Sequence, residues 1–162
     1  MLWYSSGLQF RAEIRAISEL GCACGISLGQ ADAPFLSYLL DTPPPTPLFI
    51  DSGAFRLREI TGAKWRAKLD VYERFAKIYG ESLSVVAPDV VGDQTKTLEL
   101  WAQFGRRLRD LSRVCRVIVP LQVGGLSQNA MWERAQKMID SRVVAGIPFK
   151  KSATSYEQYY SF

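Results

Sequence analysis

The stretch Leu83-Ser84-Val85-Val86-Ala87-Pro88-Asp89 decides the fold of this chain, because here an apolar run of strand length stops at a carboxylate. Three other short apolar runs also stop at a residue suited to binding: Leu48–Ile50 at Asp51, Val117–Leu121 at Gln122, and Val143–Ala145 at Gly146. Runs of this kind are typical of parallel strands that are buried on both faces. In such folds the ligand lies outside the carboxyl ends of the strands. The four strand-end residues therefore predict where a site lies.

Longer amphipathic stretches separate the apolar runs and predict helices at Lys64–Tyr79, Gln94–Leu111 and Ser127–Ile139, the last with Ser127 as its N-cap. The N-terminal part adds two more units, with strands expected at Met1–Ser5 and Cys22–Leu28 and helices at Phe10–Leu20 and Ala33–Leu40. The proline-rich stretch Pro43–Pro47 is expected to be a surface loop within one domain. The pattern predicts an α/β chain with six βα units. Both part of an eight-stranded α/β barrel, which typically takes about 250 residues, and an open six-stranded sheet fit it.

The absence of histidine limits the chemistry of this chain. It excludes Ser-His and Cys-His nucleophile systems, histidine metal sites and the usual base at neutral pH. Acid–base work must then fall on carboxylates, lysine, tyrosine or cysteine.

Charge and cysteine content give weaker indications. The net charge of +4 and the pI near 9.0 lean towards an anionic partner. Basic residues cluster between Arg106 and Arg116, but interspersed leucines favour the solvent-facing side of a helix end. An odd number of cysteines (Cys22, Cys24 and Cys115) predicts a cytoplasmic protein with free thiols, and no metal site. The chain has no apolar run of about 18 residues, so no membrane span is expected.

Two aspartates at strand ends are the main candidates for a site. Asp51 opens the segment Asp51-Ser52-Gly53-Ala54-Phe55, in which a glycine lets the backbone turn closely over a ligand. Asp51 and Ser52 acting only as turn caps is the alternative. Asp89 ends a very apolar run, where a carboxylate suggests a site that accepts hydrogen bonds from N–H groups. A helix cap is the other interpretation, but Asp93 fits that role better because Gln94 opens the next helix.

Two further strand ends carry weaker signals. The segment Gln122-Val123-Gly124-Gly125 offers an amide that can donate to and accept from the edge of a base. In Gly146-Ile147-Pro148, a glycine would let main-chain groups face a ligand directly. Lys150 and Lys151 follow and could meet phosphate, although solvated lysines are favoured.

Taken in this order, the four segments resemble the tRNA-guanine transglycosylase family. The similarity is greatest to its phage and bacterial branch, which inserts 7-deazaguanine derivatives into DNA. Asp51–Phe55 matches an Asp-Ser-Gly-Gly-aromatic segment with Ala54 in place of the second glycine, and Asp89 matches a base-recognising aspartate. Gln122–Gly125 matches a Gln-Gly-Gly segment with Val123 inserted, and Gly146-Ile147 matches a strand end that contacts the base through its backbone. The matches cover about residues 48–150.

The resemblance implies exchange of guanine for a 7-deazaguanine derivative in nucleic acid, with DNA favoured over tRNA. Asp51 would be the catalytic residue that handles protons, Phe55 would stack on the base, and Asp89 and Gln122 would read its edge. Ser52, Gly125, Gly146 and Ile147 complete the expected substrate-binding set. The implied partners are the nucleic acid and the free 7-deazapurine base, with no cofactor. Reaching a base within a duplex would require flipping it out.

The resemblance also implies a partial TIM-type (β/α)8 barrel, formed by residues 1–162 as a single domain that lacks the C-terminal strands. The family's nucleophilic aspartate lies on the strand after the one that ends at Gly146. A second chain that completes the barrel would then have to supply it. Two alternatives stay open at this point: a purine- or nucleotide-binding remnant without turnover, and an unrelated barrel lyase in which Lys150 or Lys151 forms a Schiff base.

Overall fold

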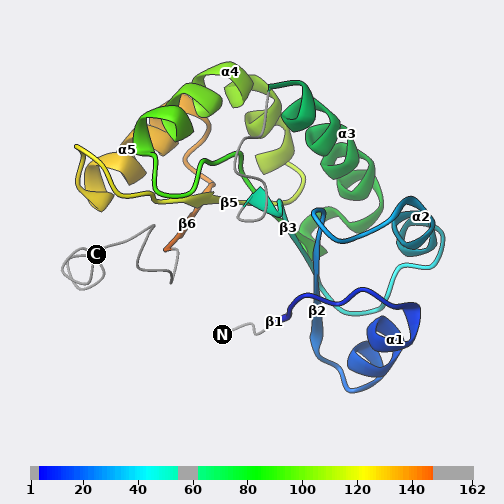
Figure 1. The fold of residues 1–162 in the computed structure, drawn as a ribbon. Coiled ribbons are helices and arrows are strands. Elements are labelled where there is room, and N and C mark those ends of the chain that lie inside the picture. The colour runs from blue at the N-terminus through cyan, green and yellow to red at the C-terminus, as the bar shows by residue number, and fades with distance from the viewer. Residues whose placement is uncertain (1–3, 55–61, 148–162) are drawn as a thin grey trace.

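The computed structural model describes residues 4–54 and 62–147 (Figure 1). In this part of the chain, strands and helices alternate. The six strands are β1 (Tyr4–Ser5), β2 (Ala23–Ser27), β3 (Leu48–Asp51), β4 (Leu83–Val86), β5 (Arg116–Pro120) and β6 (Val144–Gly146). The helices are α1 (Arg11–Glu19), α2 (Ala33–Asp41), α3 (Gly62–Tyr79), α4 (Gln94–Ser112) and α5 (Gln128–Met138), with a short 3₁₀ turn η2 (Gly80–Ser82) before β4.

The strands form one all-parallel sheet in the order β1-β2-β3-β4-β5-β6, so each strand pairs with its neighbours in sequence. Crossovers between parallel strands are almost always right-handed. Because every crossover here advances in the same direction across the sheet, the helices pack on one face of it. In Figure 1 they form an outer arc around the strands. The expected α/β class with six parallel strands is confirmed.

The sheet is strongly curled, with its concave face turned away from the helices. The hydroxyl of Tyr4 on β1 lies 3.0 Å from Oγ of Ser84 on β4. These strands are three positions apart, which in a flat sheet would separate them by about 14 Å. A tyrosine side chain does not span that distance, so the sheet must bend to close the contact. The ring of Tyr4 also packs on Phe49 of β3, with ring centroids 5.3 Å apart.

The two faces of the strands have different surroundings. Leu48 and Ile50 of β3 are fully buried towards the helices, while Phe49 and Asp51 are half-buried and line a cavity on the other face. This alternation follows from the two-residue period of a strand. Large side chains of α3 and α4, among them Trp65, Leu69, Tyr72, Trp101 and Leu108, belong to the buried core around the sheet.

Two of the helix caps were predicted from the sequence and are confirmed. The side chain of Asp93 accepts a hydrogen bond from the N–H of Lys96 at 2.9 Å, at the start of α4. Ser127 caps α5 in the same way through the N–H of Ala130. Asp93 rather than Asp89 is therefore the cap, which leaves Asp89 without that structural role.

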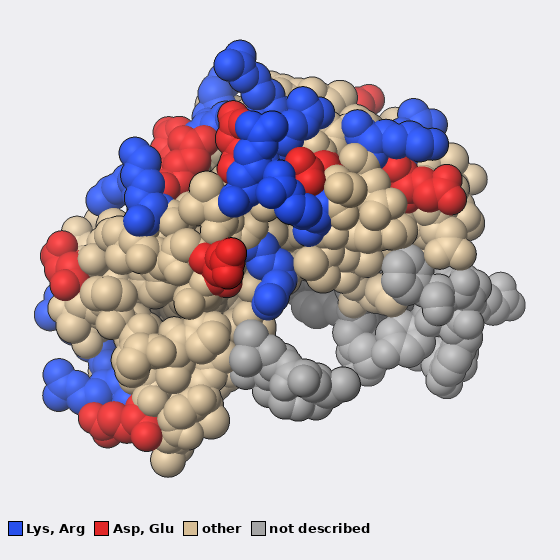
Figure 2. Space-filling view, turned by 180° about the vertical axis from the view of Figure 1, so that it is seen from behind, with Lys and Arg blue, Asp and Glu red and all other residues tan. Residues whose placement is uncertain are grey.

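The basic cluster lies largely on the solvent side of the end of α4, as expected, with Arg106 and Arg109 exposed. Arg107 is tied to Asp70 and Glu73 of α3 by ion pairs of 2.6 and 2.7 Å. Figure 2 shows Lys and Arg interleaved with Asp and Glu on this face of the molecule. We therefore assign no anion site to the cluster. None of the described helices is long and apolar enough to cross a membrane.

The Asp93 cap gives a test of the α4 boundary. Asp93→Ala should lower the free energy of unfolding by about 1 kcal/mol, because the N–H of Lys96 loses its acceptor. Asp93→Asn keeps an acceptor oxygen and should change stability by only a few tenths of a kcal/mol. Urea denaturation of both variants measures this. Equal losses for the two substitutions would contradict the assigned cap.

Candidate functional site

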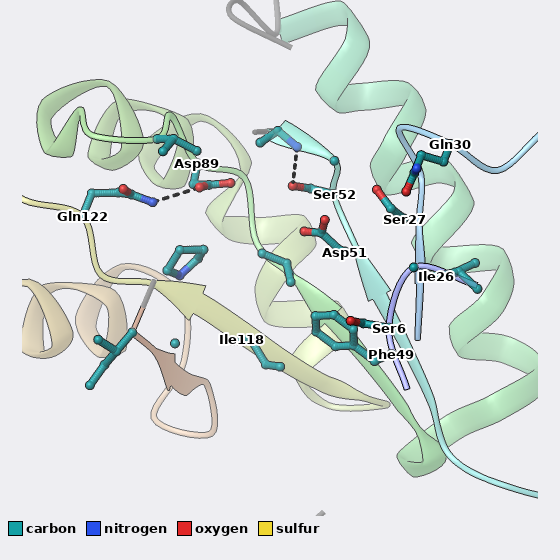
Figure 3. A pocket seen from close by; sticks show the side chains of 18 residues that line it. Ser6, Ile26, Ser27, Gln30, Phe49, Asp51, Ser52, Asp89, Ile118 and Gln122 are labelled. Atoms are coloured by element: carbon teal, nitrogen blue, oxygen red, sulfur yellow. Dashed lines mark hydrogen bonds between the residues drawn. The ribbon is translucent and has the colours of Figure 1, made fainter. Parts of the chain in front are cut away.

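A cavity of about 540 Å³ opens at the carboxyl ends of the strands and continues along the concave face of the sheet. Its lining includes all four predicted strand-end residues: Asp51 at the end of β3, Asp89 after β4, Gln122 after β5 and Gly146 at the end of β6. Ser52 and Ile147 line it as well. Figure 3 shows Asp51 and Ser52 on one side of the cavity and Asp89 with Gln122 on another.

Asp89 and Gln122 form a fixed pair in the cavity wall. Nε2 of Gln122 donates to Oδ2 of Asp89 at 2.9 Å, and Oε1 of Gln122 accepts from the N–H of Gly92 at 2.9 Å. The other carboxylate oxygen of Asp89, Oδ1, is buried and has no hydrogen-bond partner among residues 4–54 and 62–147. A carboxylate oxygen left in this way is a ready acceptor for a ligand N–H, and Nε2 of Gln122 has a second hydrogen beside it.

The backbone before and after Asp89 is held from α4. Nε1 of Trp101 donates to the carbonyl of Pro88 at 2.8 Å. Oγ1 of Thr97 accepts from the N–H of Val90 at 2.9 Å. The same hydroxyl lies within donating distance of the carbonyls of Asp93, at 2.8 Å, and Val90, at 3.3 Å. These contacts keep the carboxylate in the cavity wall, where only 5% of Asp89 is exposed.

Burial raises the pKa of Asp89 to about 7, and the negative charge of Asp51 adds to the increase. The hydrogen bond from Gln122 opposes it by stabilising the ionised form. Tyr72 of α3 is also affected by these two carboxylates. Its pKa is raised, first by full burial and then by Asp51 and Asp89, so it stays a neutral phenol. Perturbed groups of this kind are common at functional sites.

Asp51 has a different environment at the rim. It is half-buried, and its backbone carbonyl accepts from the N–H of Leu28 at 2.9 Å, which ties β3 to the loop after β2. Nζ of Lys68 on α3 donates to the carbonyl of Ser52. Burial lowers the pKa of Lys68, and the charge of Asp51 partly opposes this. Asp51 therefore stands near a cation, whereas Asp89 is paired with a neutral amide.

The turn after Asp51 depends on a glycine. Gly53 has φ +72°, in the left-handed region, and an added Cβ would lie 2.6 Å from the backbone nitrogen of Gly29. Oγ of Ser52 accepts from the N–H of Ala54 at 3.1 Å and is itself almost fully buried. The turn can thus press against the loop after β2 only because Gly53 has no side chain.

The remaining predicted residues have different outcomes. Gly125 is exposed and does not line the cavity, so its expected contact with the base has no support from its position. The sequence pattern did not distinguish it from Gly124, its neighbour. Phe55, Lys150 and Lys151 lie outside the described residues.

Residues of β2 and β3, and of the loops that follow β1 and β2, complete the cavity and were not among the predicted site residues. Ser6, Ser27 and Gln30 add hydroxyl and amide groups to its wall, and Ile26 and Phe49 contribute apolar surface. Because Ser6 and Ser27 stand at or just after strand ends, the strand-end rule could have identified them. These two strands lack a long apolar run, so the pattern did not single out their ends.

Other kinds of site find little support. Within residues 4–54 and 62–147, no group of three or more Cys, Asp or Glu side chains is placed to hold a metal ion. The three cysteines are free, with Cys24 and Cys115 buried and Cys22 exposed. Comparisons of the chain with protein-family models, with curated proteins and with solved structures found no match.

The turn at Gly53 can be tested with a matched glycine. Gly80 also has positive φ, +51°, but an added Cβ there meets nothing within 4 Å. Gly80→Ala should cost about 1–2 kcal/mol, the strain of a left-handed residue. Gly53→Ala should cost clearly more in urea denaturation, because the backbone of Gly29 must also move. Similar losses in the two variants would contradict the close approach of the two loops.

The raised pKa of Asp89 predicts how stability depends on pH. An unfolded Asp releases its proton near pH 4, whereas folded Asp89 keeps it until about pH 7. The folded state therefore binds more protons in this window, and stability falls as the pH rises from 4 through 7. The shift corresponds to at most about 4 kcal/mol.

Asp89→Asn removes the charge but keeps the shape of the side chain. We expect it to be more stable than the unsubstituted protein at pH 8, and by a clearly smaller margin at pH 5, in urea denaturation at both values. Asp93→Asn is the control, because it removes a half-buried carboxylate that does not line the cavity. A stability difference for Asp89→Asn that does not grow with pH would show that Asp89 is not held in an unfavourable ionised form.

Proposed function

We propose that this chain is a transglycosylase-like protein that exchanges guanine for a 7-deazaguanine derivative in nucleic acid, with DNA as the favoured substrate. The observation that supports this best is the buried Oδ1 of Asp89, which has no partner within the described part of the chain and lies on the carboxylate that accepts from the amide of Gln122. Guanine carries N–H donors next to its O6 acceptor. Asp89 would accept from those donors, while the second Nε2 hydrogen of Gln122 would donate to the carbonyl oxygen.

The fold suits this proposal. A curled sheet of six sequential parallel strands with helices outside corresponds to part of a (β/α)8 barrel, which we propose for residues 1–162 as a single domain. The cavity lies at the carboxyl ends of the strands, where barrel enzymes bind their substrates. We further propose that strands of a second chain complete the barrel. Three free cysteines suit a reducing compartment, so we place the protein in the cytoplasm.

Asp51 and Ser52 would act beside the bound base. Asp51 is half-buried at the rim of the same cavity, where it would pass protons to and from the base. The hydroxyl of Ser52 already accepts from Ala54, so its own hydrogen is left for a ligand. Gly146 and Ile147 also line the cavity, and their backbone would contact the base.

The exchange itself needs a nucleophile. A carboxylate would attack C1′ of the target nucleotide, the C1′–N9 bond would break, and guanine would leave after taking a proton at N9. The incoming deazapurine would then lose its N9 proton, attack C1′ and release the carboxylate, which restores the starting charges. Both carboxylates of the described cavity have other duties in this scheme. The attacking group is therefore assigned to the strand that follows β6 in the family, whichever chain supplies it.

One observation favours binding without turnover as a second candidate. The cavity as described offers only Asp51 and Asp89 as acids, and no third carboxylate in it could attack a sugar. A purine-binding protein would need only the Asp89–Gln122 pair. A Schiff-base lyase is less well supported, because no lysine lines the described cavity.

Calorimetry with guanine and with a 7-deazaguanine tests recognition. Asp89→Ala should weaken binding by about 10- to 100-fold, the loss expected for hydrogen bonds to a charged group. Because the ionised form accepts the hydrogen bonds, affinity should fall about ten-fold from pH 8 to pH 6. Asp93→Asn should bind as the unsubstituted protein does. Absence of binding to either base at pH 8 would rule out the proposed function.

Release of guanine separates exchange from binding alone. The protein is incubated with DNA or tRNA labelled in guanine, with and without the products of neighbouring genes. Label released in a reaction that Asp51→Asn abolishes supports the enzyme. Binding of the bases without release in any combination would leave the binding protein as the function.

A further inference from the structure

The side chain of Gln94, at the first residue of α4, holds the loop that carries Gln122. Its Nε2 donates to the carbonyls of Gln122 and Leu126, both at 3.0 Å, and its Oε1 accepts from the N–H of Leu126 at 2.8 Å. Only 5% of Gln94 is exposed. Both N–H groups and the oxygen of this buried amide thus hydrogen-bond to a single loop, the one between β5 and α5.

Gly124 makes room for this side chain. A Cβ added at Gly124 would lie 2.4 Å from Cβ and 2.7 Å from Oε1 of Gln94. A Cβ added at the next residue, Gly125, would meet nothing within 4 Å. The first glycine of the pair therefore has a packing role that the second lacks, and neither of them lines the cavity.

We propose that Gln94, seated against Gly124, is the positioning residue that holds Gln122 against Asp89. The contacts form a continuous path from α4 to the cavity. Gln94 fixes the backbone of Gln122, and the amide of Gln122 then donates to Oδ2 of Asp89 while accepting from Gly92. Gln94 itself does not line the cavity, so it acts through Gln122.

A titration of the free protein tests this path without any ligand. The carboxyl carbon of Asp89 is followed by ¹³C NMR and assigned with Asp89→Asn. Besides Gln122, the groups acting on Asp89 are Asp51 of β3 and the buried Tyr72 of α3. The hydrogen bond from Gln122 stabilises the ionised form of Asp89. Its loss should therefore raise the titration midpoint of Asp89 by about one pH unit.

Two independent substitutions should produce this rise: Gly124→Ala, which pushes Gln94 away, and Gln94→Met, which keeps the length of the side chain but removes its hydrogen bonds. If one of these variants does not fold, the titration of the other decides the question. Gly125→Ala is the control for Gly124→Ala. Gln128→Met controls for Gln94→Met, because Gln128 is a buried glutamine of α5 whose side-chain amide has no hydrogen-bond partner among the residues described.

A Gln122→Met background shows whether Gln94 acts through Gln122. There, Gly124→Ala and Gln94→Met should cause no further rise. The inference is overturned if the midpoint stays unchanged or falls towards the ordinary Asp value, as simple loosening and entry of water would cause. It is also overturned if the rise persists in the Gln122→Met background.

The inference rests on the proposed function in one respect, which is the identity of the ligand that the Asp89–Gln122 pair binds. Calorimetry with guanine on the same proteins keeps the two questions apart. If guanine does not bind the unsubstituted protein, the proposed function fails while the titration still decides the role of Gln94. If guanine binds but the titration fails, only the positioning path is wrong.

Discussion

Each crossover in this chain advances one strand in the same direction, so the helices pack on one face and the sheet curls away from them. In a flat sheet the ends of β2 and β6 would lie about 19 Å apart, four strand spacings. In this structure Ser27 and Gly146, at those two ends, line a single cavity. The contact between Tyr4 and Ser84 spans the concave face and requires the same curvature. Strand-end residues that are distant in sequence become one site only through this bend.

Within that cavity, Asp89 is an unfavourable residue for folding. A buried carboxylate with one oxygen unpaired loses its hydration and regains only part of it from Gln122. The surrounding contacts do not remove this cost. They hold the carboxylate in place, through Trp101 on Pro88 and Thr97 on Val90. A fold that keeps such a group so firmly in a cavity wall is better explained by binding than by stability.

The sequence was sufficient to predict the parallel strands and their end residues, because short apolar runs such as Leu83–Ala87, separated by amphipathic stretches, are typical of strands buried on both faces. It also separated Asp93 from Asp89, since a cap must stand next to the helix that it begins. It did not separate Gly124 from Gly125. The space at Gly124 is filled by Gln94, which belongs to another helix, and contacts of this kind have no local signature. The same holds for the bond between Gln122 and Asp89, which joins two strand ends.

The two carboxylates of the cavity differ in their surroundings. Asp89 titrates near neutral pH beside a neutral amide, whereas Asp51 stands at the rim near Lys68. A ligand edge with N–H donors would stabilise ionised Asp89, so its binding below pH 7 would release a proton from this group. Burial thus gives the cavity, in a chain without histidine, a hydrogen-bond acceptor whose charge changes near neutral pH.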